Sequence, residues 1–257
     1  MWDPPRVTAA QRRPSPIFLG ITAIFIGTGW AVWTGIGDPG FMVFLFVLSG
    51  WVVSLCLHEY AHAATAYHSG DHSVAAAGYL TLNPLRYSHA LLSIVLPLLF
   101  VLLGGIGLPG GAVYINPHAL RNRVRQSLVA AAGPATNVAI TLLLVFVIPD
   151  LNEITIERAA FWSALAYLCL LQFTASVINL LPIPGLDGYG IAEPWLPSDW
   201  VRNARKIAPF GILILFALLW QPEIGRPFFR AVYWTLELIG VPLELVYLGG
   251  DLFRFWS

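Results

Sequence analysis

Five consecutive residues of this chain, His58-Glu59-Tyr60-Ala61-His62, could bind and use a metal ion. Residues four apart lie on one face of a helix, so the two imidazoles could bind a single zinc ion. Glu59 would lie close enough to take a proton from a water molecule that the zinc activates, without binding the metal itself. A chance match on a helix is the alternative. A bound metal would better explain three ionisable groups so close together, because inserting each such group at the centre of a membrane helix costs about 2.5–3.5 kcal/mol of free energy.

A zinc ion that performs catalysis needs a third protein ligand and one open position. Asp187 is the candidate, because it ends the stretch 179–188, in which Pro182 and Pro184 break an apolar segment. Such a break frees the chain to point a carboxylate into a helix bundle. The alternative is an ordinary solvated Asp-Gly turn, and Glu193 is a weaker rival for the third ligand.

The remaining histidines give weaker signals. His68 and His72 are also four apart, but the Gly70-Asp71 pair between them indicates a loop, so we expect both at the surface. His89 and His118 flank an apolar run and could line the site or the membrane interface.

The composition indicates an integral membrane protein. The chain has 257 residues, of which 57% are hydrophobic and only 11% are charged, whereas about 25% are charged in soluble domains. The net charge is zero, which gives no signal for nucleic acid binding. Cys56 and Cys169 both lie in apolar stretches, so we expect neither a disulfide nor a cysteine metal cluster.

Several apolar stretches are long enough, or nearly so, to cross about 30 Å of hydrocarbon. Five candidates are 17–36, 41–67, 128–148, 159–181 and 207–220. A sixth, 228–248, is weaker because it contains Arg230, Glu237, Pro242 and Glu244, and it could instead lie in the interface. We find no repeat and no linker, so the chain is predicted to form a single membrane-embedded domain over residues 1–257.

The candidate ligands constrain the topology, because ligands of one ion must lie at one depth. The histidines stand near the end of 41–67 and Asp187 stands just after 159–181, so an even number of crossings must separate them. The stretches 128–148 and 159–181 supply two. The apolar run 90–108 contains a proline and ends in glycines, and we predict that it is re-entrant or otherwise does not cross.

Two short segments beside this run have turn residues at their ends and are predicted as β-strands, near 74–82 and near 110–116. The predicted fold is therefore an all-α polytopic membrane protein. It has about six transmembrane helices, these two strands and one non-spanning apolar segment.

The distribution of basic residues predicts the orientation. Arginines before residue 15, the arginines at 121–125 and the basic residues at 202–206 would share the cytoplasmic side, and the acidic loop 150–158 would lie outside. Both termini are then predicted to be cytoplasmic, with the active site near the cytoplasmic face.

Three sequence blocks resemble the site-2 protease family of intramembrane metalloproteases. They are the 58–62 motif, Ala132-Gly133-Pro134-Ala135-Thr136-Asn137, and the proline-rich stretch that ends in Leu186-Asp187-Gly188. The segments 80–84 and 113–117 are similar to the compact bacterial branch that lacks PDZ and CBS domains. The resemblance covers about 41–191. This sequence differs from that branch at 86–90, where the branch often carries a histidine, an acid and a proline.

The resemblance implies a role for each matching residue. His58, His62 and Asp187 would bind one Zn²⁺ per chain, and Glu59 would be the catalytic acid and base. Asn137 would line the site and act on the substrate carbonyl or the oxyanion. The remaining assignments are to substrate binding: Asn116 and Asn179.

The predicted function is an intramembrane zinc metalloprotease of the bacterial cell membrane that hydrolyses peptide bonds in or near transmembrane segments of membrane proteins, in regulated intramembrane proteolysis. The predicted strands could hold an unwound substrate segment at a sheet edge. Two alternatives remain. One is a catalytically silent relative that acts as a membrane scaffold, and the other is a metal or ion transporter.

Overall fold

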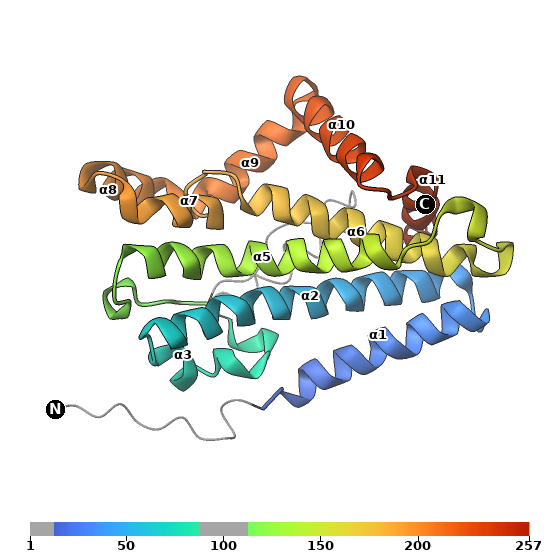
Figure 1. Cartoon of the computed structure of the whole chain (residues 1–257), viewed down its shortest axis with the longest axis horizontal. Coiled ribbons are helices and arrows are strands. Elements are labelled where there is room, and N and C mark those ends of the chain that lie inside the picture. The colour runs from blue at the N-terminus through green and yellow to red at the C-terminus, as the bar shows by residue number, and fades with distance from the viewer. Residues whose placement is uncertain (1–12, 88–112, 257) are drawn as a thin grey trace.

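The structure, a computed structural model, describes residues 13–87 and 113–256, and within those ranges it contains helices and no strands. Four long helices lie side by side along the long axis of the molecule (Figure 1). They are α1 (Pro16–Thr34), α2 (Pro39–Ser69), α5 (Arg123–Val147) and α6 (Ala159–Asn179).

Capping residues in the sequence set the ends of these helices. The side chains of Ser15, Asp38 and Asn122 each accept a hydrogen bond from a backbone N–H in the first turn of α1, α2 and α5. Gly35 and Gly70 end α1 and α2 at positive φ angles of 72° and 123°, which an L side chain rarely adopts.

Shorter helices connect and extend the bundle. Between α2 and α5 lie α3 (Ser73–Ala76) and the 3-10 turns η2 (Tyr79–Thr81), η3 (Pro84–Arg86) and η5 (Pro117–Ala119). The loop from α5 to α6 contains η6 (Leu151–Glu153) and η7 (Ile156–Arg158). After α6 follow α7 (Asp187–Ala192), η8 (Glu193–Trp195), α8 (Ser198–Ile207), η9 (Ala208–Phe210), α9 (Gly211–Trp220), α10 (Pro222–Leu238) and α11 (Leu243–Phe253).

The main core lies where α2, α6 and α11 meet. Helix α1 joins it through Phe25, whose ring stacks on Phe46 of α2 with centroids 4.7 Å apart. Gly50 lets the two helices approach, because a Cβ there would lie 2.7 Å from the Phe25 ring. Small residues are used in this way where helices pack inside a bilayer.

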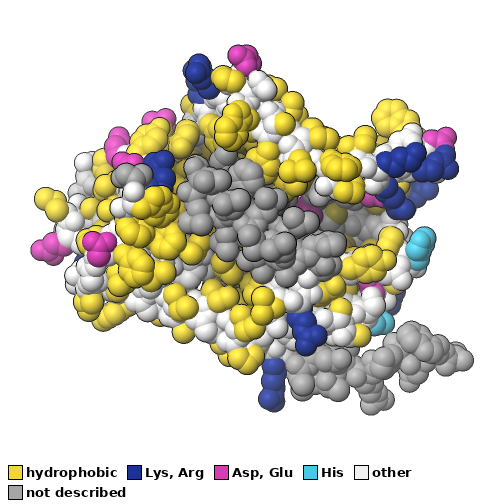
Figure 2. Space-filling view, turned by 180° about the vertical axis from the view of Figure 1, so that it is seen from behind, with side chains coloured by type: hydrophobic (Ala, Val, Ile, Leu, Met, Phe, Trp, Pro, Cys, Tyr) yellow, Lys and Arg dark blue, Asp and Glu magenta, His cyan; other side chains and the backbone are white. Residues whose placement is uncertain are grey.

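Large apolar side chains cover much of the outer surface. Trp30 of α1 is 65% exposed and Phe146 of α5 is 88% exposed. Figure 2 shows hydrophobic side chains over the broad face, with many of the charged side chains toward its two ends. An apolar patch of this extent is expected on a membrane protein and not on a soluble one.

Five helical segments in the described ranges are long and apolar enough to cross a membrane: Pro16–Thr34, Pro39–Ser69, Arg123–Val147, Ile156–Asn179 and Ser198–Trp220. The described residues therefore do not support the prediction of about six. The sixth candidate, 228–248, is divided between α10 and α11, because the chain turns at Gly240, which has a φ of 97°, just before Pro242.

The predicted strands are wrong wherever they can be compared with the structure. The segment 74–82 forms α3 and η2, and Val113–Asn116 is irregular. Asp71 starts a tight turn by accepting hydrogen bonds from Ser73, and Gly78 and Leu82 both have positive φ, which interrupts an extended chain. Residues 110–112 and the apolar run 90–108 lie outside the described ranges.

The two ends of the described chain lie at different levels of the bundle. Helix α1 begins partway along α2 and runs toward the end of the bundle where α11 lies (Figure 1). This arrangement does not support the prediction that both termini share one side of the membrane.

The contact between α11 and α6 generates a stability prediction. A Cβ on Gly249 would lie 2.0 Å from the Ser163 carbonyl oxygen, so Gly249→Ala must push α11 away from α6. We expect the free energy of unfolding to fall by about 1–3 kcal/mol, the usual cost of overpacking a core. Thermal unfolding in detergent, followed by tryptophan fluorescence, would measure it. The control is Gly27→Ala, since no heavy atom lies within 4 Å of a Cβ at that exposed position. Equal melting temperatures for the two variants would contradict the prediction.

Candidate metal centre

The two histidines of the 58–62 motif project from one face of α2, a turn apart. His58 is 4% exposed and His62 is 5% exposed, so both imidazoles lie inside the bundle. Their Nε2 atoms lie 3.1 Å from each other. The sequence prediction that they share a face is confirmed.

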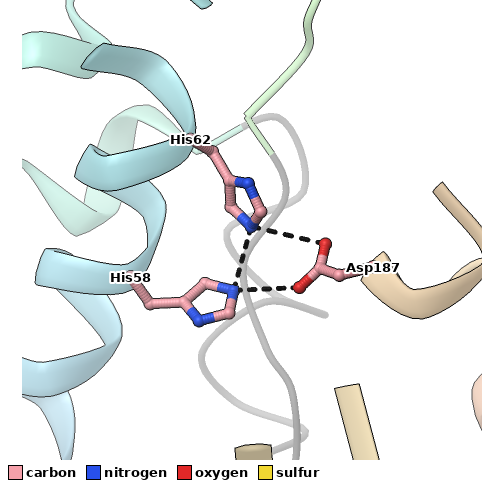
Figure 3. Close-up of side chains that lie close together, drawn as sticks. All are labelled: His58, His62 and Asp187. Atoms are coloured by element: carbon pink, nitrogen blue, oxygen red, sulfur yellow. Dashed lines mark hydrogen bonds and ion pairs between the residues drawn. The ribbon is translucent and has the colours of Figure 1, made fainter. Parts of the chain in front are cut away.

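Asp187 reaches the same point from the opposite side, as the first residue of α7 (Figure 3). The chain leaves α6 at Asn179 and turns sharply, with Gly185 at a φ of 99°. Gly188 allows the turn to close, because a Cβ there would lie 2.2 Å from the Leu180 carbonyl oxygen. Helix α7 is then held against α5 through Ser127, which donates to the Ile191 carbonyl oxygen at 2.7 Å.

The carboxylate of Asp187 faces both imidazoles. Its Oδ2 lies 3.3 Å from His58 Nε2, and its Oδ1 lies 3.3 Å from His62 Nε2. One ligand atom from each of the three residues lies within 4.8 Å of the others. Between these ligands the described chain contains two helices long and apolar enough to cross a membrane, α5 and α6, which fits the shared depth that the ligands require.

These separations fit a tetrahedral metal site. Ligand atoms about 2.0–2.1 Å from zinc at tetrahedral angles are about 3.3 Å apart from one another. The nitrogen–nitrogen and nitrogen–oxygen distances here are 3.1 to 3.3 Å. Two histidines and one carboxylate also form a donor set that zinc accepts in catalytic sites.

Neighbouring groups orient the ligands. The Nδ1 of His62 lies 2.7 Å from the Val129 carbonyl oxygen, which can only accept, so this nitrogen carries the proton and Nε2 presents its lone pair to the site. Before a metal binds, burial would raise the pKa of the Asp187 carboxyl, but protonated imidazoles at His62 and His58 would outweigh that effect and hold the pKa well below its usual range. The carboxylate is therefore in the ionised form that a metal requires.

Gly133 of α5 keeps the space between the ligands open. A Cβ at this position would lie 2.2 Å from His62 Nε2 and 2.5 Å from His58 Nε2. In the sequence, Gly133 belongs to a family motif, but nothing there indicates a contact with the metal ligands. Only the packing of α5 on α2 reveals that contact.

Glu59 lies beside the three ligands without belonging to their group. It is 2% exposed, and its Oε1 is 3.9 Å from His58 Nε2. Its Oε2 accepts a hydrogen bond of 3.1 Å from the backbone N–H of Val113. This second contact orients the carboxylate, and no pattern in the sequence predicts it.

The predicted asparagines differ in their surroundings. Asn137 is buried on α5, one turn after Gly133, and Asn179 is buried at the end of α6. Asn116 is partly buried, and its side chain accepts from the His118 N–H, which caps a 3-10 turn. Their roles in catalysis and substrate binding stay predictions.

The rival residues take other positions. Glu193 pairs with Arg205 at 3.0 Å and is not among the three clustered ligands. His68 is exposed and His72 partly exposed, and both rings pack edge-on against Tyr67. His89 lies outside the described ranges, and His118 is exposed. Cys56 and Cys169 are both buried.

Known proteins that resemble this chain carry the name zinc metalloprotease. The chain is 47% identical over 249 residues to "Putative zinc metalloprotease Rip2" of Mycolicibacterium smegmatis, and 45% identical over 249 residues to the protein of the same name in Mycobacterium tuberculosis. Each match covers 95% of both chains. "Putative zinc metalloprotease YwhC" of Bacillus subtilis is 28% identical over 179 residues, which cover 66% of this chain and 78% of YwhC. No protein-family model and no solved structure matches the chain.

The position of Gly133 generates a prediction about metal content. Gly133→Ala would place a methyl group against both Nε2 atoms, so we expect zinc to fall from about one ion per chain to less than a tenth of that. Elemental analysis of the purified protein would measure it. The matched control is Gly20→Ala, where a Cβ has no heavy atom within 4 Å. Full zinc occupancy in Gly133→Ala would show that the histidines do not bind the metal in this arrangement.

Proposed function

Because this chain belongs to the site-2 protease family of zinc metalloproteases, we propose that it is an intramembrane zinc endopeptidase. It would hydrolyse peptide bonds in or beside transmembrane segments of other membrane proteins, within a single membrane-embedded domain. The observation that supports this most is the convergence of His58, His62 and Asp187 next to Glu59.

The three converging residues would hold one Zn²⁺ per chain. Two imidazole nitrogens and one carboxylate fill three positions, and a fourth position stays available for chemistry. Two contacts favour this arrangement: the hydrogen bond from His62 to the Val129 carbonyl oxygen, and the space that the absence of a side chain at Gly133 leaves beside both histidines. When bound there, zinc would supply Lewis acidity, which polarises a scissile carbonyl and makes a water molecule easier to deprotonate.

Glu59 would handle the proton. Its carboxylate accepts a proton from the attacking water as the water oxygen bonds to the carbonyl carbon, and it gives that proton to the leaving nitrogen as the C–N bond breaks. The products are a new carboxyl terminus and a new amino terminus. The Val113 N–H, which donates to Oε2, would keep the carboxylate turned toward the site. Asn137 would donate to the developing oxyanion.

The charges favour a site near the cytoplasmic face of a bacterial cell membrane. The end of the bundle that carries α7 and α8 also carries the start of α5, with Arg123 and Arg125, and the basic residues of α8. The loop between α5 and α6, at the opposite end, contains Asp150, Glu153 and Glu157. Cytoplasmic loops usually carry the excess of arginine and lysine.

The substrate would be a membrane protein whose helix unwinds before cleavage, since a helical segment hides its carbonyl groups in internal hydrogen bonds. Regulated intramembrane proteolysis is the process in which such an activity would serve. The sequence also predicted that substrate would pair with a sheet edge, but residues 13–87 and 113–256 contain no strand that could provide one.

Two other functions are less well supported. An ion path through the membrane should place ionisable groups at several depths, whereas the buried ones here, His58, Glu59, His62 and Asp71, gather in the second half of α2 and just after it. A catalytically silent scaffold would have no use for Glu59 beside a complete ligand set.

Three proteins compared in one assay would test the proposal: wild type, Glu59→Gln and Asp187→Ala. We expect Glu59→Gln to keep zinc and lose at least ~100-fold in the cleavage rate of a single-span substrate, because the amide cannot accept the proton. We expect Asp187→Ala to lose both zinc and cleavage. Elemental analysis and gel-based cleavage in detergent would measure the two properties.

A chelator supplies the control. Removal of zinc from the wild type should stop cleavage, and added Zn²⁺ should restore it. A zinc-free wild type, or cleavage that persists in Glu59→Gln, would overturn the protease assignment in favour of the scaffold or the transporter.

A further inference from the structure

Asp71 is a buried carboxylate that stands two residues after the end of α2. Its side chain is almost fully enclosed, with 1% of the residue exposed. The sequence suggests only a loop residue there, between His68 and His72, whereas the structure gives both carboxylate oxygens specific partners.

Three donors converge on this carboxylate. Oδ1 accepts from the Ser73 backbone N–H at 3.0 Å and from the Ser73 hydroxyl at 2.5 Å. Oδ2 accepts from the backbone N–H of Asn116 at 2.7 Å, across 45 residues of sequence. An ionised carboxylate is the side chain that only accepts, so it suits a site where every facing group donates.

The bond to Asn116 fixes one end of a segment whose other end contacts Glu59. The Val113 N–H donates to Glu59 Oε2 at 3.1 Å. Three residue steps of extended chain cover about 10 Å, so Val113–Asn116 lies alongside the last turns of α2. Two carboxylates from this part of the chain therefore hold the two ends of one short segment.

Packing supports the same position for the segment. Val113 and Ile115 pack against a buried cluster that includes Ala63 and Ala66 of α2. Just beyond, Ala119 lies so close to Gly70 that a Cβ on Gly70 would be 2.7 Å from the Ala119 carbonyl oxygen. Asp71 is the buried charged group at this contact.

An ordinary local turn does not explain this arrangement. An Asp that only starts a turn bonds to the backbone two residues on, as Asp71 does with Ser73, and its second oxygen is then free for solvent. Here the second oxygen is buried and bonded to a distant part of the chain.

We propose that Asp71 is a positioning residue for the reaction. By holding Asn116, it fixes Val113–Asn116 against α2, and through the Val113 N–H it fixes the orientation of the Glu59 carboxylate. This inference rests on the proposed function for its catalytic consequence, but the anchoring of the segment can be measured without any activity.

The test replaces the acceptor and, separately, the donor. Asp71→Asn puts an NH₂ group against donors, and Asn116→Pro removes the N–H while Asp71 stays intact. For both variants we expect faster hydrogen exchange at the backbone amides of residues 113–115. For Asp71→Asn we also expect kcat for a single-span substrate to fall about 10- to 100-fold, the usual effect of losing a group that orients a ligand or base, with KM within about twofold. Zinc content should stay at the wild-type value, and kcat is compared at a temperature at which both proteins are folded.

Two matched variants control for local effects. Ser73→Ala removes one donor near Asp71 but leaves the bond to Asn116, and Asn116→Ala removes that side chain but keeps its N–H. Both should show wild-type exchange at residues 113–115, because the bond that Asn116→Ala removes comes from the N–H of His118, outside that range.

Several outcomes would overturn the inference. These are unchanged exchange in Asp71→Asn, faster exchange with an unchanged kcat, or a fall in kcat that merely follows lost zinc or unfolding at the assay temperature. A wild type without Glu59-dependent cleavage would instead overturn the proposed function, and the exchange comparison would still decide whether Asp71 holds the segment.

Discussion

The structure depends on the meeting of two imidazole nitrogens and one carboxylate, 3.1 to 3.3 Å apart, inside a bundle of apolar helices. Such groups are costly to bury unless they bind one another or a metal. Ligands of one ion must lie at one depth, so the chain must return to the level of His58 before it presents Asp187. Helices α5 and α6 make that return, and the break after Asn179 turns the carboxylate inward.

The same constraint determines where small residues are needed. The hydrophobic effect does little to bring helices together in lipid, so close approach depends on the shapes of the facing surfaces. Gly50 admits the Phe25 ring, and Gly249 admits the backbone of α6 at Ser163. Gly133 serves chemistry as well as packing, because the volume it leaves free lies against both histidine nitrogens. One helix surface therefore sets both the spacing of α5 and α2 and the room available for a metal.

The sequence predicted the features that depend on spacing along one helix or on the number of crossings. The 58–62 pair needs only the helical period. Asp187 was a candidate because prolines break the apolar segment before it, and an even number of crossings was then required to bring it to the depth of that pair. The sequence did not predict features that depend on distant backbone contacts. The segment 74–82 is apolar enough for a strand, yet a turn at Asp71–Ser73 and the positive φ of Gly78 and Leu82 fold it into short helices. Hydropathy likewise joined 228–248 into one span, although Gly240 and Pro242 divide it. The hydrogen bond from Val113 to Glu59 links residues 54 apart, and no local sequence pattern predicts it.

The length of α2 explains how water could reach a site in such an apolar protein. With 31 residues, α2 is about 46 Å long, whereas the hydrocarbon core is about 30 Å thick. If α2 enters the hydrocarbon near Pro39, His58 stands about 29 Å along the helix, close to the opposite boundary of that layer. The last turns, with the Asp71 contact beyond them, would then extend toward the aqueous side. A site at this boundary can admit both reactants of hydrolysis, since a membrane segment can approach from the lipid and water from the interface.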